Sequence, residues 1–517
     1  AADHKDSPEH LALRLRETRS YEVGDTATFW KWDLSVMPPL WVQTPATCRA
    51  VGAHSYIFVA DSEWGVHMVQ SDVDEALFRL EESTVNDSTR GAIEMDIDLF
   101  GPIPDELDND PRLIVFYSAL GSFQGNYFDG YFSPYNQVTE AQAQQMNPPG
   151  HSNECEMIYM TCHPLDPIAP VRLSVLAHEL QHLIHWGQDA NEETWLNEGC
   201  SELAMVVYGV PDPITGFPSN PDNNLTAWNQ TFADYVKVML FFTYLQEHYD
   251  AAGLIQDLVS DPANGISSLT QKLSIHHPDT SFEELFANWG TANIVDPHAP
   301  QDSLWGYSQL DLPPFNATFV DWTEELTNQT IQPYATDYLF LECYELGRMI
   351  SIASDNPVSA RQAIFSSNGF FQGVVDEGTG TFFEIYLPTS YDAEYVRLVI
   401  SNPYPVSVVY SVNSTVGNDD HLAQTPALGN VTCHPNPFKG KTSISYALKE
   451  PAPLCLEIYN SRGQRIRTLV DEIQPGGSHE TVWDGRDGAG RAVSSGVYFA
   501  RLSSRGFQRD KRLILLK

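Results

Sequence analysis

The chain of 517 residues has little positive charge and no long apolar run, and each shortage excludes a class of protein. Its 29 lysines and arginines are set against 68 aspartates and glutamates, which gives a net charge of −39. A surface this acidic repels nucleic acid and anionic membranes, so we exclude both as partners. No apolar run approaches the roughly 18 residues of a membrane-spanning helix, and the sequence therefore predicts no transmembrane segment.

Cysteine is also scarce, with seven residues, and none of them forms a C-x-x-C metal pair. Because the number is odd, at least one thiol stays unpaired. Cys155 and Cys162, like Cys433 and Cys455, are close enough in sequence for a local disulfide, and the sequence alone leaves this open. The first residues carry no hydrophobic segment, so we expect a cytosolic protein or a mature form without its signal peptide.

The composition, with 42% hydrophobic and 11% aromatic residues, is that of a folded protein, and the length predicts several domains. Residues 1–90 are predicted to form a mixed subdomain, and residues 91–298 an α+β domain in which apolar strands precede helices. Beyond residue 298, short alternating runs between Gly, Pro, Asn and Asp predict an all-β domain over 299–417. A polar linker follows, and alternating strands over 425–517 predict a small β-sandwich of about seven strands.

The stretch that carries chemistry is His-Glu-x-x-His at residues 178–182, within a helix that we expect to begin near Pro170. His178 and His182 are four residues apart and project from one face, so their imidazole nitrogens can bind one zinc ion. Glu179 lies beside them, where it can take a proton from a water that the metal activates. The apolar residues around the motif indicate a buried helix, which argues against two ordinary surface histidines.

Catalytic zinc takes a third protein ligand and leaves one position open for water. The metzincin spacing would require Gly at position 185 and His at position 188, but the chain has His185 and Gln188. The remaining solution is a glutamate from a following helix, and the sequence predicts such a helix from about residue 194. Glu198 on that helix is the candidate, 16 residues after His182.

The run Trp-Leu-Asn-Glu-Gly at 195–199 resembles the signature of gluzincin peptidases, in which this glutamate is the third zinc ligand. The resemblance implies that Glu198 completes the zinc site. It also implies that Glu202, one turn further on, hydrogen-bonds His178 or His182 and thereby orients that ligand. Many such enzymes use a Tyr or His to stabilise the oxyanion. Tyr235, in a helix expected over 232–249, is our candidate catalytic donor; the alternative is an ordinary core aromatic.

Residues 20–297 as a whole resemble secreted bacterial metallopeptidases related to hyicolysin and the immune-inhibitor-A-like proteins. The residues that carry this resemblance are 178–184, 195–199 and 235–249. It implies a zincin-like fold for the α+β domain, with residues 1–90 as part of the peptidase unit and Zn²⁺ as the cofactor. It also implies an accessory β-sandwich over 299–417. The acidic loop at 105–110 can bind a structural Ca²⁺, although it lacks the EF-hand spacing.

The C-terminal 90 or so residues resemble the FlgD-like immunoglobulin domain that serves as a type IX secretion sorting domain. The residues that carry this second resemblance are Pro-Asn-Pro-Phe at 435–438, 458–463, Trp-Asp-Gly-Arg-Asp at 483–487, and 495–499. The resemblance implies export to the surface or exterior of a Gram-negative-type bacterium. The outer-membrane secretion machinery would then be a partner of this domain.

Together these features predict a secreted zinc metallopeptidase that hydrolyses peptide bonds within protein or peptide substrates by glutamate-assisted attack of water. Endopeptidase action is expected because no Gly-rich exopeptidase motif is present. The alternative is a catalytically silent adhesin or glycan-binding protein that keeps a peptidase fold, for which the aromatic residues of 121–135 would be suited. A decayed enzyme would usually have lost at least one of the residues named above.

Overall fold

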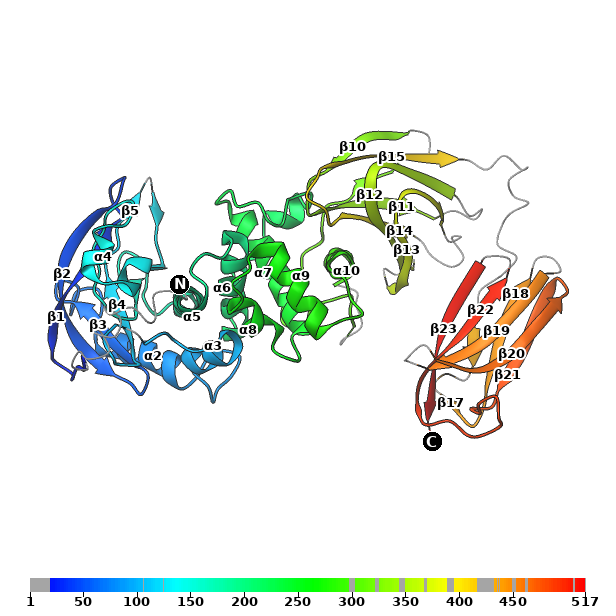
Figure 1. The fold of residues 1–517 in the computed structure, drawn as a ribbon, viewed down its shortest axis with the longest axis horizontal. Coiled ribbons are helices and arrows are strands. Elements are labelled where there is room, and N and C mark those ends of the chain that lie inside the picture. Colours follow the sequence, from blue (N-terminus) through cyan, green and yellow to red (C-terminus); the bar gives the residue numbers. More distant parts are fainter. Residues whose placement is uncertain are drawn as a thin grey trace. The chain divides into compact units, whose positions relative to one another are not determined.

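The computed structural model describes residues 19–516 with short gaps, and it divides into two compact units at residues 415 and 416. The gaps are residues 106, 124, 297–302, 321–324, 344–348, 367–369, 388–394, 416–431, 435, 437, 449–451, 461–463 and 505–506. The described chain forms curled β-sheets and a cluster of helices (Figure 1). Among the described helices, none is both long and apolar enough to span a membrane.

The first unit begins with a six-stranded sheet whose order is β1-β2-β3-β4-β8-β7. Its three central strands are parallel and wholly buried, as their unbroken apolar runs require of strands covered on both faces. The edge strand β7 pairs antiparallel with β8. The bounds are β1 Thr26–Asp33, β2 Leu40–Val51, β3 Ser55–Ala60, β4 Leu113–Ser118, β7 Gly130–Phe132 and β8 Met157–Thr161.

Backbone groups on the free edge of β1 form hydrogen bonds with side chains that reach them from the other side of the sheet. The backbone of Trp30 exchanges two hydrogen bonds with the Asn153 amide, at 2.8 and 2.9 Å. The Trp32 N–H donates to the Tyr131 hydroxyl at 3.0 Å. The β1–β2 hairpin therefore curls over the outer face of the sheet. The contacts also occupy backbone groups that could otherwise pair with a strand of another chain.

Helices cover the other face, and α5 (Pro170–Gln188) lies between the sheet and α6 (Thr194–Tyr208), with α7 (Phe232–Tyr249) beyond (Figure 1). The predicted starts of all three helices near 170, 194 and 232 are observed. Gly199 of α6 faces the Phe242 ring so closely that a Cβ atom would lie 2.2 Å from it, so α6 and α7 can only pack this tightly at a glycine. The other helices are α2 Gln70–Glu81, α3 Ala92–Phe100, α4 Glu140–Ala143, α8 Leu254–Val259, α9 Gly265–His276 and α10 Phe282–Val295.

A second sheet, β10-β15-β12-β14-β11-β9 with β13 on β12, completes the first unit. The first half of β12 pairs with β15 and its second half with β14, and an irregularity at residues 353–358 separates the two halves. Such a break lets one long strand bend, so the sheet curls around its own apolar core. The bounds are β9 Thr318–Phe319, β10 Leu326–Ile331, β11 Ala335–Glu342, β12 Met349–Phe365, β13 Phe371–Tyr386, β14 Tyr395–Asn402 and β15 Val408–Thr415.

This second sheet also packs against the helices, because residues such as Tyr338 and Val399 belong to the same core cluster as α5, α6 and α7. The Tyr338 hydroxyl donates to the Gly290 carbonyl of α10 at 2.7 Å. The all-β texture predicted for 299–417 is observed in its described residues. The separate domain boundaries at residues 90 and 298 stay predictions.

The second unit is a β-sandwich, which confirms the architecture predicted for the C-terminal region. Its two sheets, β16-β18-β21 and β17-β23-β22-β19-β20, enclose one apolar core that includes the fully buried Trp483. The bounds are β16 Thr432–His434, β17 Phe438–Lys439, β18 Thr442–Leu448, β19 Ala452–Asn460, β20 Arg465–Gln474, β21 Gly477–Trp483, β22 Gly496–Ser504 and β23 Phe507–Leu516.

All seven cysteines are free thiols in the structure, so the two local disulfides that the sequence left open are absent. Cys155 belongs to the core on the outer face of the first sheet, whereas Cys162 belongs to the core on the helix side. Cys433 packs towards the sandwich core, while Cys455 alternates with the core residues Leu454 and Leu456 and therefore points away from it.

A buried lysine anchors the long loop that leads into α7. The Lys237 ammonium, which is fully buried, donates to Asp234 Oδ1 at 2.7 Å, to Asn223 Oδ1 at 3.0 Å and to the Ala227 carbonyl at 2.6 Å. Burial opposes the charged form of both partners, but the ion pair with Lys237 keeps the pKa of Asp234 below its usual value. The ion pair thus fixes the start of α7.

We predict that Lys237→Met destabilises the first unit by about 3–5 kcal/mol, because it leaves Asp234 as a buried charge without its cation. A second change, Asp234→Asn, should recover part of that loss. Urea unfolding followed by tryptophan fluorescence measures both. Lys272→Met is the control, since Lys272 is partly exposed and its partner Asp261, 3.5 Å away, keeps hydrogen bonds from Ser268 and the Ala263 N–H, so the loss should be less than about 1 kcal/mol. Equal losses in the two lysine variants would contradict the prediction.

Asp337 on β11 provides a pH-dependent contribution to stability. Burial, followed by the nearby charge of Asp222, raises the pKa of Asp337 to about 7, and the Tyr410 hydroxyl that donates to it at 3.0 Å only partly offsets this. Asp337 therefore stays protonated up to a higher pH in the folded state than in the unfolded state, where its pKa is about 3.9. The resulting stability is complete below about pH 4 and is lost as the pH rises through about 7.

We therefore expect Asp337→Asn to be more stable than the wild type at pH 8, by on the order of 2 kcal/mol, and to differ little from it at pH 4. Urea midpoints at pH 4, 6 and 8 give the comparison. Asp279→Asn, at an exposed position, is the matched control and should follow the wild type at every pH. A variant curve parallel to that of the wild type would show that Asp337 is not the titrating group.

Candidate metal centre

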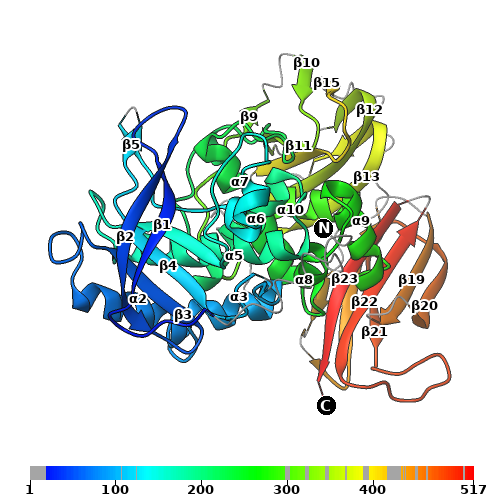
Figure 2. The same cartoon turned by 60° about the vertical axis from the view of Figure 1, so that its left-hand side comes forward.

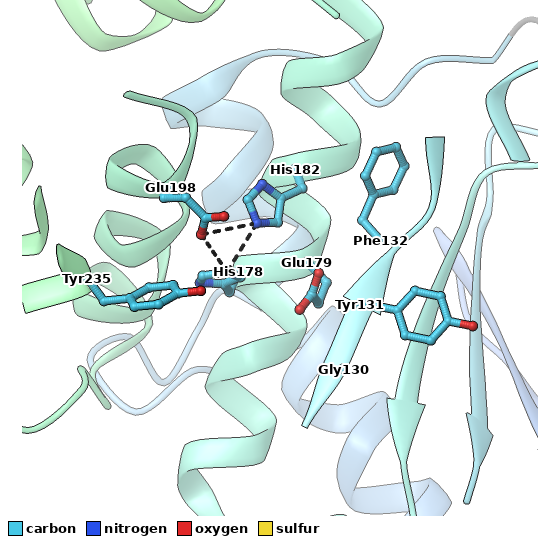
Figure 3. A pocket seen from close by; sticks show the side chains of 8 residues that line it. All are labelled: Gly130, Tyr131, Phe132, His178, Glu179, His182, Glu198 and Tyr235. Atoms are coloured by element: carbon cyan, nitrogen blue, oxygen red, sulfur yellow. Dashed lines mark hydrogen bonds and ion pairs between the residues drawn. The ribbon is translucent and has the colours of Figure 1, made fainter. Parts of the chain in front are cut away.

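Three electron-pair donors converge where α5 meets α6. His178 and His182 come from adjacent turns of α5, and Glu198 comes from α6 (Figure 3). The two Nε2 atoms lie 3.1 Å apart, and each lies 3.7 Å from Glu198 Oε2. The structure thus brings together the three ligands that the sequence predicted.

These separations fit a zinc ion. Tetrahedral zinc with ligand bonds of about 2.0–2.2 Å places its ligand atoms about 3.3–3.5 Å apart, close to the three observed distances. The chemistry of the donors also fits, because two imidazoles and one carboxylate are common zinc ligands. Three acceptors that point at one spot repel one another unless a cation lies between them, and a proton can join only two of them.

The other ring nitrogen of His182 is held by two residues of α6. His182 Nδ1 lies 2.6 Å from Asn197 Oδ1 and 3.0 Å from Ser201 Oγ. The Ser201 hydroxyl itself donates to Gln181 Oε1, so it can only accept from the imidazole. Because both neighbours accept, the proton of a neutral His182 sits on Nδ1 and the lone pair of Nε2 faces the ligand triangle.

His178 is oriented in the same way by a carboxylate. Its Nδ1 lies 3.4 Å from Glu202 Oε1, and Glu202 is almost fully buried. Burial alone would lower the pKa of His178, but the contact with Glu202 and the charges of Glu179 and Glu198 raise it to about 9. The sequence left open which histidine Glu202 orients, and the structure places it on His178.

Glu179 is buried beside the ligands and lies against the edge strand β7 (Figure 3). Burial and then the charge of Glu198 raise its pKa to about 7, whereas His178 and a backbone hydrogen bond from Phe132 act in the opposite sense. Gly130 is needed at this contact, since a Cβ atom there would lie 2.9 Å from Met160 Sδ and the Tyr159 carbonyl, and 3.3 Å from Glu179 Cγ. The strand thus restricts where the Glu179 carboxylate can sit.

Tyr235, in the first turn of α7, directs its ring towards His178 and lines the same pocket (Figure 3). Its ring packs edge-on against Trp228, with centroids 4.8 Å apart. Burial and the carboxylates of Glu198, Glu202 and Glu179 raise the pKa of Tyr235, so the hydroxyl stays protonated and can donate. The pocket encloses about 320 Å³, and its remaining lining comes from Gly130, Tyr131 and Phe132 of β7.

Other polar residues near the motif are used elsewhere. His185 is fully buried and contacts Gln181 at 3.2 Å, so it is no ligand. Asn197 and Ser201 are functional neighbours that the sequence analysis did not identify. Asn197 directly precedes Glu198, and Ser201 follows Glu198 by three residues, so helical spacing was an available signal for Ser201 only.

The acidic loop at 105–110 has one feature of a cation site. Oxygen atoms of Asp105, Asp108 and Glu156 lie within 4.8 Å of one another. Asp110, from the same loop, instead accepts hydrogen bonds from Tyr56 and Arg112. The structural Ca²⁺ suggested by the sequence stays a prediction.

We predict that Asn197→Ala and Ser201→Ala each weaken zinc binding by about 10–100-fold, because each removes an acceptor that orients His182. Competition of the metal-free protein with a chelating dye measures the affinity. Asn197→Asp keeps the acceptor and should stay near the wild type, and Asn191→Ala, at an exposed asparagine between the helices, is the second control. Affinities within threefold of the wild type in both alanine variants would show that the two contacts do not orient the ligand.

Comparison with known proteins identifies one part of the chain. Residues 435–506 match the FlgD Ig-like domain. No curated protein matches the sequence. The C-terminal β-sandwich is therefore similar to the FlgD Ig-like domain over these residues, in agreement with the second resemblance noted in the sequence.

Several solved structures show partial likeness. PorZ of Porphyromonas gingivalis, an essential surface component of that bacterium's type IX secretion system, is 17% identical over 23% of this chain and 14% of its own, with a TM-score of 0.14. Dimeric latent PorU of the same organism is 15% identical over 39% of this chain and 19% of its own, with a TM-score of 0.18. A β-glucuronidase of Faecalibacterium prausnitzii is 10% identical over 35% of this chain and 36% of its own, with a TM-score of 0.15. The chain thus spans less than a fifth of the length of the first two.

Proposed function

We propose that this protein is a zinc-dependent endopeptidase of the gluzincin type, with a zincin-like catalytic region. The observation that carries the proposal is the convergence of His178, His182 and Glu198 beside the buried carboxylate of Glu179. Structural zinc sites are usually closed by four protein ligands, whereas three ligands facing a pocket leave room for water and substrate. The arrangement therefore favours catalysis over a purely structural metal.

His178, His182 and Glu198 would hold the metal. Glu202 would orient the imidazole of His178, and Asn197 and Ser201 would orient that of His182. When bound there, zinc supplies Lewis acidity that polarises the scissile carbonyl and makes a water molecule more acidic. Glu179 accepts the proton of this water as the water attacks the carbonyl carbon, and then returns the proton to the leaving amine. Because burial raises its pKa to about 7, the Glu179 carboxylate accepts a proton more readily than an exposed glutamate does, and its protonated form can still give the proton up.

Tyr235 would stabilise the negative charge that develops on the carbonyl oxygen. Its hydroxyl lies on the opposite side of His178 from β7, so it would approach that oxygen from a direction Glu179 does not use (Figure 3). Because the surrounding carboxylates keep the phenol protonated, Tyr235 donates rather than accepts.

The substrate side of the pocket is an edge strand. The Asp129 carbonyl accepts from Thr161 of β8 at 2.9 Å, so alternation along β7 turns the backbone groups of Gly130 away from the sheet. An extended peptide can pair with such an edge by strand addition. This supports polypeptide substrates rather than compact small molecules.

The second unit supports a location outside the cell. FlgD Ig-like domains resemble the sorting domains of type IX secretion, and residues 435–506 form one here. We propose that this unit directs the chain to the outer-membrane secretion machinery of a Gram-negative-type bacterium and leaves the peptidase secreted or on the cell surface. The alternative of a silent adhesin or glycan-binding protein has no specific contact in its favour among the described residues.

We expect Glu179→Gln to keep its zinc and to lower the rate of casein cleavage by at least about a hundredfold, because the amide cannot accept the proton. Zinc content by atomic absorption and release of labelled fragments give the two readings. Glu94→Gln, at an exposed glutamate of α3, is the control and should match the wild type.

Cleavage by the wild type should stop with a chelator and return with zinc. Wild-type cleavage rates in Glu179→Gln would exclude this glutamate as the proton acceptor. A wild type that binds one zinc but cleaves neither casein nor a peptide library would favour the adhesin.

A further inference from the structure

The β1–β2 hairpin ends in an exposed apolar tip. Val36, Met37 and Leu40 there are 38%, 65% and 57% exposed. The short hairpin of β5 (Ser122–Phe123) and β6 (Asn126–Tyr127) lies next to this tip and adds Tyr127, which is 49% exposed (Figure 2). We call these four side chains the tip surface.

The tip surface is held in a fixed place even though its side chains face solvent. The Leu34 N–H donates to the Leu120 carbonyl at 3.1 Å, and the buried Lys31 ammonium donates to the Ala119 carbonyl at 2.7 Å. At Gly121 a Cβ atom would lie 2.9 Å from the Ser35 nitrogen, so the two hairpins meet backbone to backbone. A group of apolar side chains kept exposed on a fixed backbone is typical of a binding surface.

The tip surface is close along the chain to the edge strand of the proposed active site. Tyr127 precedes Gly130, the first residue of the strand that lines the pocket, by three residues, or about 10 Å of extended chain. Trp32, at the base of the tip, stacks on Tyr131 of the same strand with centroids 5.2 Å apart, on the outer face of the sheet, and so holds the hairpin beside this strand. A peptide laid along β7 and past Gly130 would therefore reach the tip surface.

The charge of this region favours one kind of occupant. Residues 34–43 contain no charged side chain, in a protein whose net charge is −39. Loops that dock on membranes usually surround their apolar residues with lysine or arginine, and none stands here. Apolar side chains of an unfolded polypeptide need no such charges, and burial of two or three of them gives substantial affinity.

We propose that the tip surface is a docking site for the apolar side chains of an extended polypeptide, which it guides along β7 towards the metal centre. This inference rests on the proposed peptidase function for its role, but binding itself can be measured without cleavage. The substrate class that follows is unfolded or flexible protein with apolar residues some distance from the cleaved bond.

The test uses the full chain with Glu179→Gln, loaded with zinc, and fluorescently labelled β-casein as the probe. We expect Met37→Ser combined with Leu40→Ser to raise the Kd for casein about tenfold, since two apolar contacts are lost. The control is Val23→Ser combined with Ile275→Ser, two positions that are 66% and 64% exposed and lie away from the tip. Zinc affinity and the thermal midpoint should be unchanged in both double variants.

An unchanged casein Kd in the tip variant, or an equal rise in the control, would overturn the proposal. Binding of the protein to phosphatidylcholine vesicles that the tip variant loses, with casein binding unaffected, would make the tip surface a membrane contact instead. The proposed function can fail separately: a wild type that does not cleave casein, but whose casein Kd depends on the tip, leaves a polypeptide-binding surface without peptidase activity.

Discussion

The mutual repulsion of three electron-pair donors, held 3.1 to 3.7 Å apart where α5 meets α6, is the constraint on which the candidate metal centre depends. Such an arrangement persists only because packing imposes it and a cation can relieve it. The sheet supports α5 on one side, and α6 supports it on the other, close enough that Gly199 must lack a side chain beside Phe242. The apolar core therefore supplies the force that places polar groups in an unfavourable geometry.

The surroundings of the three donors decide which atoms they present. Acceptors behind each imidazole keep its proton on Nδ1 and direct Nε2 towards the shared point. Burial raises the pKa of Glu179 and of Glu202 to about 7, which means that this region holds more carboxylates than it would tolerate as charges without a cation. Metal affinity and the protonation of these groups are thus expected to be linked.

All the groups of this centre come from the first unit, between β7 and the start of α7. The second unit has its own apolar core and contributes none of them. The candidate site and the match to the FlgD Ig-like domain over residues 435–506 therefore lie in different units of the chain. The strong negative charge favours solubility, and residues 34–43 at the tip of the β1–β2 hairpin carry no charged side chain.

Local periodicity was enough to determine that α5 exists and that His178 and His182 share one face, because a four-residue spacing is a property of any helix. Resemblance pointed to Glu198, and turn residues with alternating strands predicted the C-terminal sandwich. Only the tertiary structure decided that Glu202 meets His178, that Asn197 and Ser201 hold His182, and that β7 lies against Glu179. It also placed Cys155 and Cys162 on opposite faces of a sheet. These contacts join different elements, and packing, which no local pattern encodes, determines which residues meet.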